Sequence, residues 1–353
     1  MNLILTFDYE LFGDGSGDVF KHMIEPTNRI LEICEKNNIK ITIFFELIEY
    51  IKLKEEWDRG NTMGYQENPI KAMDDQLQQA ALDGHDIQLH IHPQWHNAKY
   101  VNGKWHINLN NWRLGDFKGE DNYGIKELIS DCKTALEALI KPVKPDYKCV
   151  GLRAGGYNIM PSAEVYSAML ALGMKYDSSV YPGGYETGNL SKYDYRRIPL
   201  EFDHWWTDAS DIRKVSDKEK EILEIPIFAL PVARWKRILT ASKIKSLLFR
   251  KNNAISSNAK EKIGKKSIAG KIKFMLQKEA STWDVCMFSQ ALHKKFFRHI
   301  ENNLVNQRNN FVLIGHPKSL QNKILFEDFI STAQKRKTNY QFKTLTEYYE
   351  SII

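Results

Sequence analysis

The stretch "DIQLHIHPQWH", which runs from Asp86 to His96, decides how the rest of the chain is interpreted. Its first half alternates apolar and polar residues as a β-strand does, and three histidines follow close together. Residues two apart on a strand share a face, so His90 and His92 are expected to project the same way. His96 lies four residues beyond His92, a spacing that lets both imidazoles reach one ion if the chain turns. The stretch therefore predicts a strand that ends in one side of a metal site.

Other runs of strand-like sequence recur along the chain and alternate with segments of helical period. The strand candidates, of which the last is the weakest, are Leu3–Asp8, Lys40–Glu46, Cys149–Ala154, Lys175–Val180, Ile222–Leu230, Phe311–His316 and Tyr340–Leu345. The helix candidates are Glu25–Asn38, Asn68–Gly84, Lys126–Pro142 and Ser162–Gly173. Repeated β–α units of this length predict a βα barrel or an open doubly wound sheet.

Residues capable of chemistry follow several of these strands directly. In both architectures, functional groups gather at the carboxyl ends of the parallel strands. Besides the histidines, Asp8 and Glu10 end the first strand, Arg153 lies in "CVGLRAGGY", and His316 ends "FVLIGH". Each alone has an ordinary structural explanation, such as a helix cap, an ion pair or a core histidine. Together they favour a site in which one carboxylate and two histidines hold Zn²⁺ or another first-row ion. The second carboxylate would then act as a base.

On these residues the chain resembles the polysaccharide deacetylase family (carbohydrate esterase family 4), from Leu3 to about Leu320. The family's T-F-D-D-G motif is similar to "TFDYE", in which Asp8 corresponds to the base. Tyr9 replaces the adjacent metal ligand, and Glu10 is the expected substitute. "RAGGY" resembles R-x-P-Y-G, so Arg153 would orient the base. "LIGHP" makes His316 the general acid.

Two motifs depart from the family pattern. The family has two metal-binding histidines four residues apart, but the position four beyond His90 is Gln94. His92 and His96 keep the spacing with a shift, so His90, His92 and His96 all remain candidate ligands. The fourth motif, normally an Asp and a Trp, leaves only Asp177.

The resemblance implies a distorted (β/α)7-8 barrel of the polysaccharide deacetylase type, formed as a single domain by residues 1–353. It implies a metal-dependent hydrolase that removes an N-acetyl group from an amino sugar in intracellular glycan or surface-polysaccharide biosynthesis. One divalent ion is expected, zinc first, with cobalt, nickel or manganese as alternatives. The Gly156 backbone N–H would face the oxyanion. The rings of four aromatic residues would either stack on sugar faces or pack within the protein: Trp95, Tyr157, Trp205 and Trp206.

Two other functions stay open at this point. The same barrel supports hydrolysis of other C–N bonds, as in allantoinase-like relatives that act on cyclic ureides. Because two motifs are altered, a sugar-binding pseudoenzyme that has lost its ion is the second alternative.

Charge is concentrated in one segment of the chain. The net charge is +6, yet between Arg234 and Lys278 fourteen Lys or Arg residues face one acid, Glu261. We expect a basic, partly helical insertion at about 234–280, which could contact an anionic membrane or remain solvated. No nucleic-acid partner is expected, because no groove-reading motif accompanies the charge.

The start of the sequence does not resemble a secretory signal, and the four cysteines form no C-x-x-C pair. A cytoplasmic location, with thiols as small core residues, is therefore expected.

Overall fold

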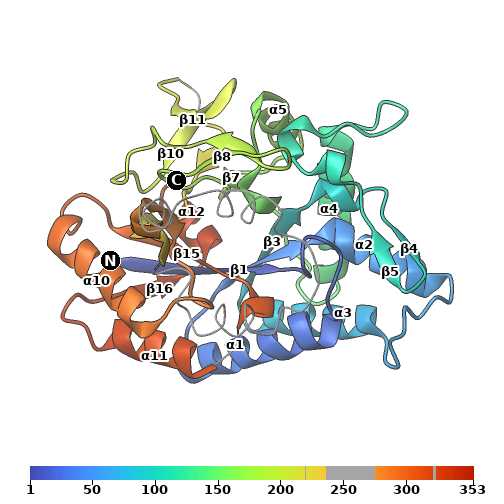
Figure 1. Ribbon diagram of the computed structural model, residues 1–353, viewed down its shortest axis with the longest axis horizontal. Helices are drawn as coiled ribbons and strands as arrows, with labels where there is room; N and C mark the ends of the chain where they lie inside the picture. The colour runs from blue at the N-terminus through green and yellow to red at the C-terminus, as the bar shows by residue number, and fades with distance from the viewer. Residues whose placement is uncertain (219, 236–274, 321–322) are drawn as a thin grey trace.

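A row of parallel strands forms the wall of a barrel (Figure 1). The computed structural model describes residues 1–218, 220–235, 275–320 and 323–353. Neighbouring strands follow the order β12-β7-β6-β3-β2-β1-β15, and each adjacent pair is parallel. Their bounds are β1 (Asn2–Tyr9), β2 (Thr42–Glu46), β3 (Asp86–Ile91), β6 (Gly151–Ala154), β7 (Tyr176–Asp177), β12 (Leu223–Glu224) and β15 (Asn310–Gly315). Nearly every residue of β1, β2 and β3 is buried, as expected of strands covered on both faces.

The two ends of this row meet, so the sheet closes. Just beyond β12, Ile227 forms a parallel bridge with Val312 of β15, and the Phe228 N–H donates to the Val312 carbonyl at 2.8 Å. Asp284 forms a second bridge with Ile314, on the same strand. These bonds pair an edge that an open sheet would leave exposed. The predicted distorted βα barrel is therefore confirmed, and the open doubly wound alternative is wrong.

Helices surround the barrel and pack on its outer face (Figure 1). Their bounds are α1 (Glu25–Lys36), α2 (Leu47–Asp58), α3 (Pro69–Leu82), α4 (Ile125–Ile140), α5 (Ala163–Ala171), α10 (Gln290–Asn303), α11 (Lys323–Gln334) and α12 (Leu345–Glu350), with a π-helical turn η1 (Phe20–Ile24) leading into α1. Local chemistry sets several ends. The Asn68 side chain accepts from the N–H groups of Ile70 and Lys71 at the start of α3. Gly84 and Gly173 take the left-handed conformation after α3 and α5, as their positions predict.

Short strands and single turns complete the described part. Three short antiparallel pairs lie outside the main sheet: β4 (Lys99–Val101) with β5 (Lys104–His106), β8 (Tyr185–Thr187) with β9 (Lys192–Asp194), and β13 (Ala229–Ala233) with β14 (Lys278–Thr282). β16 (Gln341–Lys343) pairs with the beginning of β1. The 3-10 turns are η2 (Pro93–Trp95), η3 (Leu109–Asn111), η4 (Leu114–Asp116), η5 (Gly155–Tyr157) and η6 (Pro317–Ser319).

Two details differ from the sequence-based expectation. The run Ile222–Leu230 is not one strand, because it divides into β12, the bridge at Ile227 and the start of β13. The segment 191–220 is rich in aromatic and charged residues, a composition that predicts an elaborated loop. It instead contains β9 and the pair β10 (Trp205–Asp208) and β11 (Asp211–Val215). β10 joins the main sheet by pairing antiparallel with β12. Its two tryptophans are residues that favour strands.

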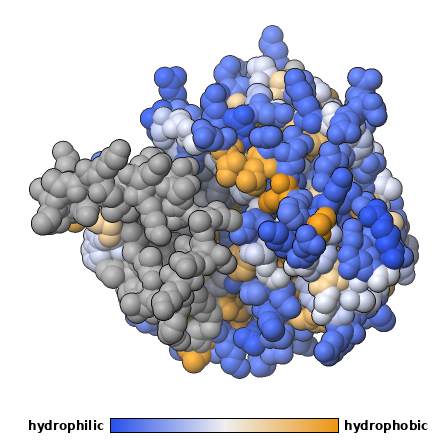
Figure 2. Space-filling model, turned by 45° about the vertical axis from the view of Figure 1, so that its right-hand side comes forward, coloured by the Kyte–Doolittle hydropathy of each residue, from blue (hydrophilic) through white to orange (hydrophobic). Residues whose placement is uncertain are grey.

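The surface in the view of Figure 2 is mainly hydrophilic, with a small hydrophobic area near its centre. No helix in the described ranges is long and apolar enough to cross a membrane. Most of the expected basic insertion, residues 236–274, lies outside the described residues. The single-domain organisation therefore stays a prediction. The four cysteines are buried without disulfides, as core residues.

Candidate active site

The carboxyl ends of four parallel strands bring the sequence-predicted residues to one rim of the barrel. Asp8 lies near the end of β1, and Glu10 follows it. His90 lies in β3, and His92 follows it. Arg153 lies in β6, and His316 directly follows β15. All of these side chains except that of His316 are less than a tenth exposed. Parallel strands end at the same edge, which is why residues so far apart in sequence meet here.

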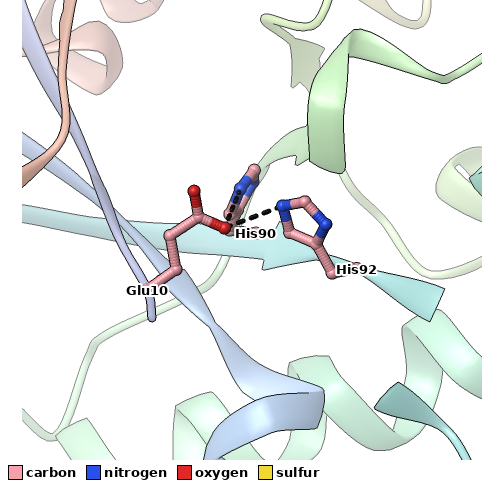
Figure 3. Close-up of side chains that lie close together, drawn as sticks. All are labelled: Glu10, His90 and His92. Atoms are coloured by element: carbon pink, nitrogen blue, oxygen red, sulfur yellow. Dashed lines mark ion pairs between the residues drawn. The ribbon is translucent and has the colours of Figure 1, made fainter. Parts of the chain in front are cut away.

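Glu10, His90 and His92 form a compact group whose ligand atoms all lie within 4.8 Å of one another (Figure 3). The Oε2 atom of Glu10 lies 2.7 Å from Nε2 of His92 and 3.5 Å from Nε2 of His90. Two imidazoles and one carboxylate are the ligand types preferred by zinc and related ions, with positions left for water.

The surroundings of His90 suit a ligand role. Its Nδ1 lies 2.8 Å from the backbone carbonyl oxygen of Arg153, which can only accept, so Nδ1 carries the proton and donates. The Nε2 atom is buried and has no hydrogen-bond partner among the described residues. An imidazole oriented through one nitrogen and open at the other is the usual state of a metal-binding histidine. The donor set therefore fits a divalent ion.

His92 is held closely by the turn that follows β6. A Cβ atom added at Gly155 would lie 2.5 Å from the His92 ring, so only glycine fits at this position. Gly155, the first glycine of "RAGGY", therefore allows the His92 imidazole to approach closely from the neighbouring strand.

Asp8 is paired with Arg153 inside the barrel. The Arg153 Nη1 atom lies 2.7 Å from Asp8 Oδ1, and the same guanidinium donates to Thr6 Oγ1 and to the backbone oxygen and hydroxyl of Ser178. Burial alone would raise the pKa of Asp8, but the Arg153 charge, with His90 and His316, holds that pKa below its ordinary value. Asp8 is therefore an ionised carboxylate at neutral pH.

His316 lies on the other side of Asp8. Its Nε2 atom is 3.6 Å from Asp8 Oδ2 and 3.9 Å from Glu10 Oε1. On the opposite edge of the ring, Nδ1 is 3.8 Å from Oδ2 of Asp284. Burial lowers the pKa of His316, but the nearby carboxylates of Asp284 and Asp8 outweigh it, so the net shift is upward.

Sequence reasoning missed two charged residues of this rim. Asp284 accepts backbone N–H bonds from Cys286 and Met287 through Oδ1, which leaves Oδ2 facing His316. Lys318 places Nζ 2.8 Å from Glu10 Oε1 and also donates to the Leu11 carbonyl. Burial would raise the pKa of Glu10, but Lys318, then His92, holds that pKa well below its usual range. The only available signal for Lys318 was its position two residues after His316.

A tryptophan that sequence reasoning also missed lies against the metal-ligand group. The Trp112 ring centre is 6.2 Å from that of His92, edge to face. Its Nε1 is buried and has no hydrogen-bond partner among the described residues. No strand pattern precedes Trp112, so nothing in the sequence linked it to the site.

The remaining predicted residues lie elsewhere or play other parts. His96 stacks on Tyr123 with ring centres 4.6 Å apart and does not join the group of Glu10, His90 and His92. Trp95 is buried against Trp105 and offers no exposed face to a sugar.

Gly156, at φ +56°, and Tyr157 form the turn after β6, and the Tyr157 ring packs on Tyr181. Trp205 and Trp206 lie in β10.

Asp177 ends β7, which pairs with β6. Asp177 accepts hydrogen bonds from the backbone N–H and hydroxyl of Ser179, at 2.8 Å each. Its neighbour Ser178 accepts from the guanidinium. The hydrogen bonds of Asp177 thus shape the turn that carries Ser178, which accepts from Arg153.

Solved structures of other proteins resemble this chain in fold, whereas the sequence comparisons found nothing. No family model and no curated protein matches the sequence. The fold matches that of a probable polysaccharide deacetylase from Pseudomonas aeruginosa PAO1, with a TM-score of 0.50 and 13% identity over 99% of this chain and 89% of that one. Puue allantoinase matches with a TM-score of 0.48 and 11% identity over the same shares. A 4-alpha-glucanotransferase from Thermococcus litoralis has a TM-score of 0.48 and 12% identity, covering 100% of this chain and 40% of that one. The match to the Pseudomonas aeruginosa structure therefore supports the polysaccharide deacetylase fold for this chain, as the resemblance predicted.

Proposed function

We propose that this protein is a metal-dependent hydrolase that removes an N-acetyl group from an amino sugar. The observation that supports this best is the meeting of three functions within one small volume. Glu10, His90 and His92 form a ligand group, Asp8 is an ionised carboxylate 3.9 Å from His90, and His316 lies 3.6 Å from Asp8.

In this proposal each residue has a separate task. A divalent ion at Glu10, His90 and His92 would lower the pKa of a water towards about 7 and polarise the amide carbonyl. Asp8 takes the proton from the attacking water as its oxygen bonds to the carbonyl carbon. Arg153 keeps Asp8 ionised and fixes Oδ1, so that Oδ2 is left for the water. The Gly156 N–H donates to the developing oxyanion.

His316 completes the reaction by donating a proton to the amine nitrogen as the C–N bond breaks. The products of the reaction are acetate and a free amino sugar. Asp284 orients the ring from the other side, and the raised pKa keeps a larger fraction of His316 protonated near neutral pH.

The cellular setting belongs to the same proposal. A cytoplasmic enzyme would act on an acetylated glycan or surface-polysaccharide precursor. The basic segment at about 234–280 would provide peripheral contact with an anionic membrane. Support for the membrane contact comes from the sequence alone, because residues 236–274 lie outside the described part.

Two measurements test the activity. Protein purified without chelator should contain about one equivalent of zinc, cobalt, nickel or manganese, and it should release acetate from N-acetylated amino sugars. A panel that adds cyclic ureides distinguishes the allantoinase-like alternative, since ring opening releases no acetate. Protein that contains no metal and hydrolyses neither class, yet still binds a glycan, would contradict the proposal and favour the pseudoenzyme.

A further inference from the structure

Gln94 is a fully buried amide next to the metal-ligand group. It lies in η2, two residues beyond His92, with a relative exposure of 0%. Its Nε2 atom lies 2.9 Å from Nδ1 of His92. Its Oε1 atom is buried and has no hydrogen-bond partner in the described part of the chain. In Figure 3, one ring nitrogen of His92 faces Glu10 and the other lies on the opposite edge of the ring.

The hydrogen bonds of His92 define one tautomer. A neutral imidazole has a single N–H, and the Gln94 amide group donates to Nδ1 in this arrangement. The proton therefore lies on Nε2, which donates to Glu10 Oε2 at 2.7 Å. A nitrogen that carries a proton has no lone pair for a metal, so this tautomer forms a hydrogen bond to Glu10 rather than a coordination bond to an ion.

Coordination through Nε2 requires the proton on Nδ1, and an acceptor must then face Nδ1. A half-turn of the Gln94 carboxamide about its terminal bond exchanges its oxygen and nitrogen at almost the same positions. Oε1, which has no partner in the present arrangement, would then accept from Nδ1–H. The same side chain can support both tautomers without moving its stem.

His90 differs in this respect. Its Nδ1 faces the backbone oxygen of Arg153, which accepts only, so His90 is fixed in the tautomer that leaves Nε2 open. One ligand is therefore permanently oriented for a metal, and the other has an adaptable partner.

We propose that Gln94 is a positioning residue for the metal site, which sets the tautomer of His92 by turning its carboxamide when an ion binds. This inference rests on the proposed metal-dependent function. Orienting partners of metal-binding histidines typically change metal affinity by about 10–100-fold. The position also explains why a glutamine can occur four residues after His90, where a second histidine was expected.

The first test follows the tautomers directly in wild-type protein. Protein with ¹⁵N-labelled histidine is stripped with chelator and then titrated with Zn²⁺, and the imidazole nitrogens are assigned with His90→Ala and His92→Ala variants. We expect His92 to change from a protonated Nε2 to a protonated Nδ1 on zinc binding, while His90 keeps its Nδ1 proton throughout. An unchanged His92 tautomer would overturn the inference.

The second test measures Zn²⁺ affinity by calorimetry in Gln94→Leu and Gln94→Glu. Leucine cannot accept from Nδ1, so affinity should fall by about 10–100-fold. Glutamate restores an acceptor, so this variant should bind within a few-fold of wild type. Unfolding curves of the stripped proteins check that both variants are folded, and the tautomer experiment needs neither variant. Equal zinc affinities of wild type and Gln94→Leu would contradict the role of Gln94 and leave the proposed function intact. Absence of zinc binding in wild type would refute the proposed function and, with it, this inference.

Discussion

Arg153 contacts both halves of the candidate site through different atoms. Its guanidinium binds Asp8 Oδ1 at 2.7 Å, and its backbone oxygen accepts from His90 Nδ1 at 2.8 Å. Strand β6 lies beside β3, in a register that pairs His90 with Arg153, so one residue serves the base and a ligand. The orientation of the base and that of the metal ligand are thus linked by a single backbone position.

Replacing Arg153 with methionine should destabilise the protein strongly. The change leaves the Asp8 carboxylate buried without its cation, which typically costs about 3–5 kcal/mol. Urea denaturation measures the loss. The double variant Asp8→Asn/Arg153→Met should recover part of the stability, because both charges are then removed. A double variant whose loss of stability equals the sum of the losses in Asp8→Asn and Arg153→Met would show that the pair is not coupled.

Replacing Asp8 with asparagine should remove turnover and leave metal binding largely intact. Asparagine keeps the shape of the side chain but cannot accept a proton, so acetate release should fall by at least about 10²–10⁴-fold. Metal content, measured on the same preparation, should remain near that of wild type because Asp8 is not in the ligand group. Wild-type rates in Asp8→Asn would disprove the assignment of the base.

Replacing His90 with alanine should weaken metal binding, whereas the same change at His96 should not. His90 contributes an open, buried Nε2 to the ligand group, and His96 stacks on Tyr123 outside it. His96→Ala is therefore the matched control. Calorimetry with Zn²⁺ and elemental analysis check both variants. A larger loss in His96→Ala would mean that the shifted histidine pair, His92 and His96, binds the ion.

Strand-level features of the fold and site were predictable because they depend on short-range patterns. Apolar runs located the barrel strands, and the rule that parallel strands carry function at their carboxyl ends brought Asp8, Arg153 and His316 together. The period of two placed His90 and His92 on one face. The sequence could not decide about His96, because the direction of the chain after His92 depends on the turn η2.

Residues that act through tertiary contacts were not predictable. Asp284 reaches His316 only because its segment bridges to Ile314 beside β15. Trp112 stands at no motif position. Gln94 stands where the family pattern has a second histidine, but that position does not predict its contact with Nδ1 of His92. The division of Ile222–Leu230 likewise follows from barrel closure, which requires Ile227 to pair with Val312 rather than to continue a straight strand.

Burial of His293 makes stability depend on pH far from the candidate site. His293 is 1% exposed, and the Trp283 indole N–H donates to its Nδ1 at 2.9 Å. Burial lowers the pKa of His293 to about 3, whereas a histidine in the unfolded chain has a pKa of about 6.5. Between these values the unfolded chain binds a proton that the native protein does not bind. The contribution to stability is therefore complete above about pH 6.5 and is lost as the pH falls towards 3.

The expected result is a steeper loss of stability on acidification in wild type than in His293→Leu. From pH 7 to pH 5, this one group should lower the free energy of unfolding by roughly 2 kcal/mol. Urea denaturation of both proteins at the two pH values measures the difference. The leucine variant also leaves the Trp283 N–H without this acceptor, but that cost is the same at both pH values and cancels. His85, whose pKa burial lowers to about 4, acts in the same direction in both proteins and cancels too. Parallel pH profiles for the two proteins would mean that His293 is already protonated in the native core at pH 5.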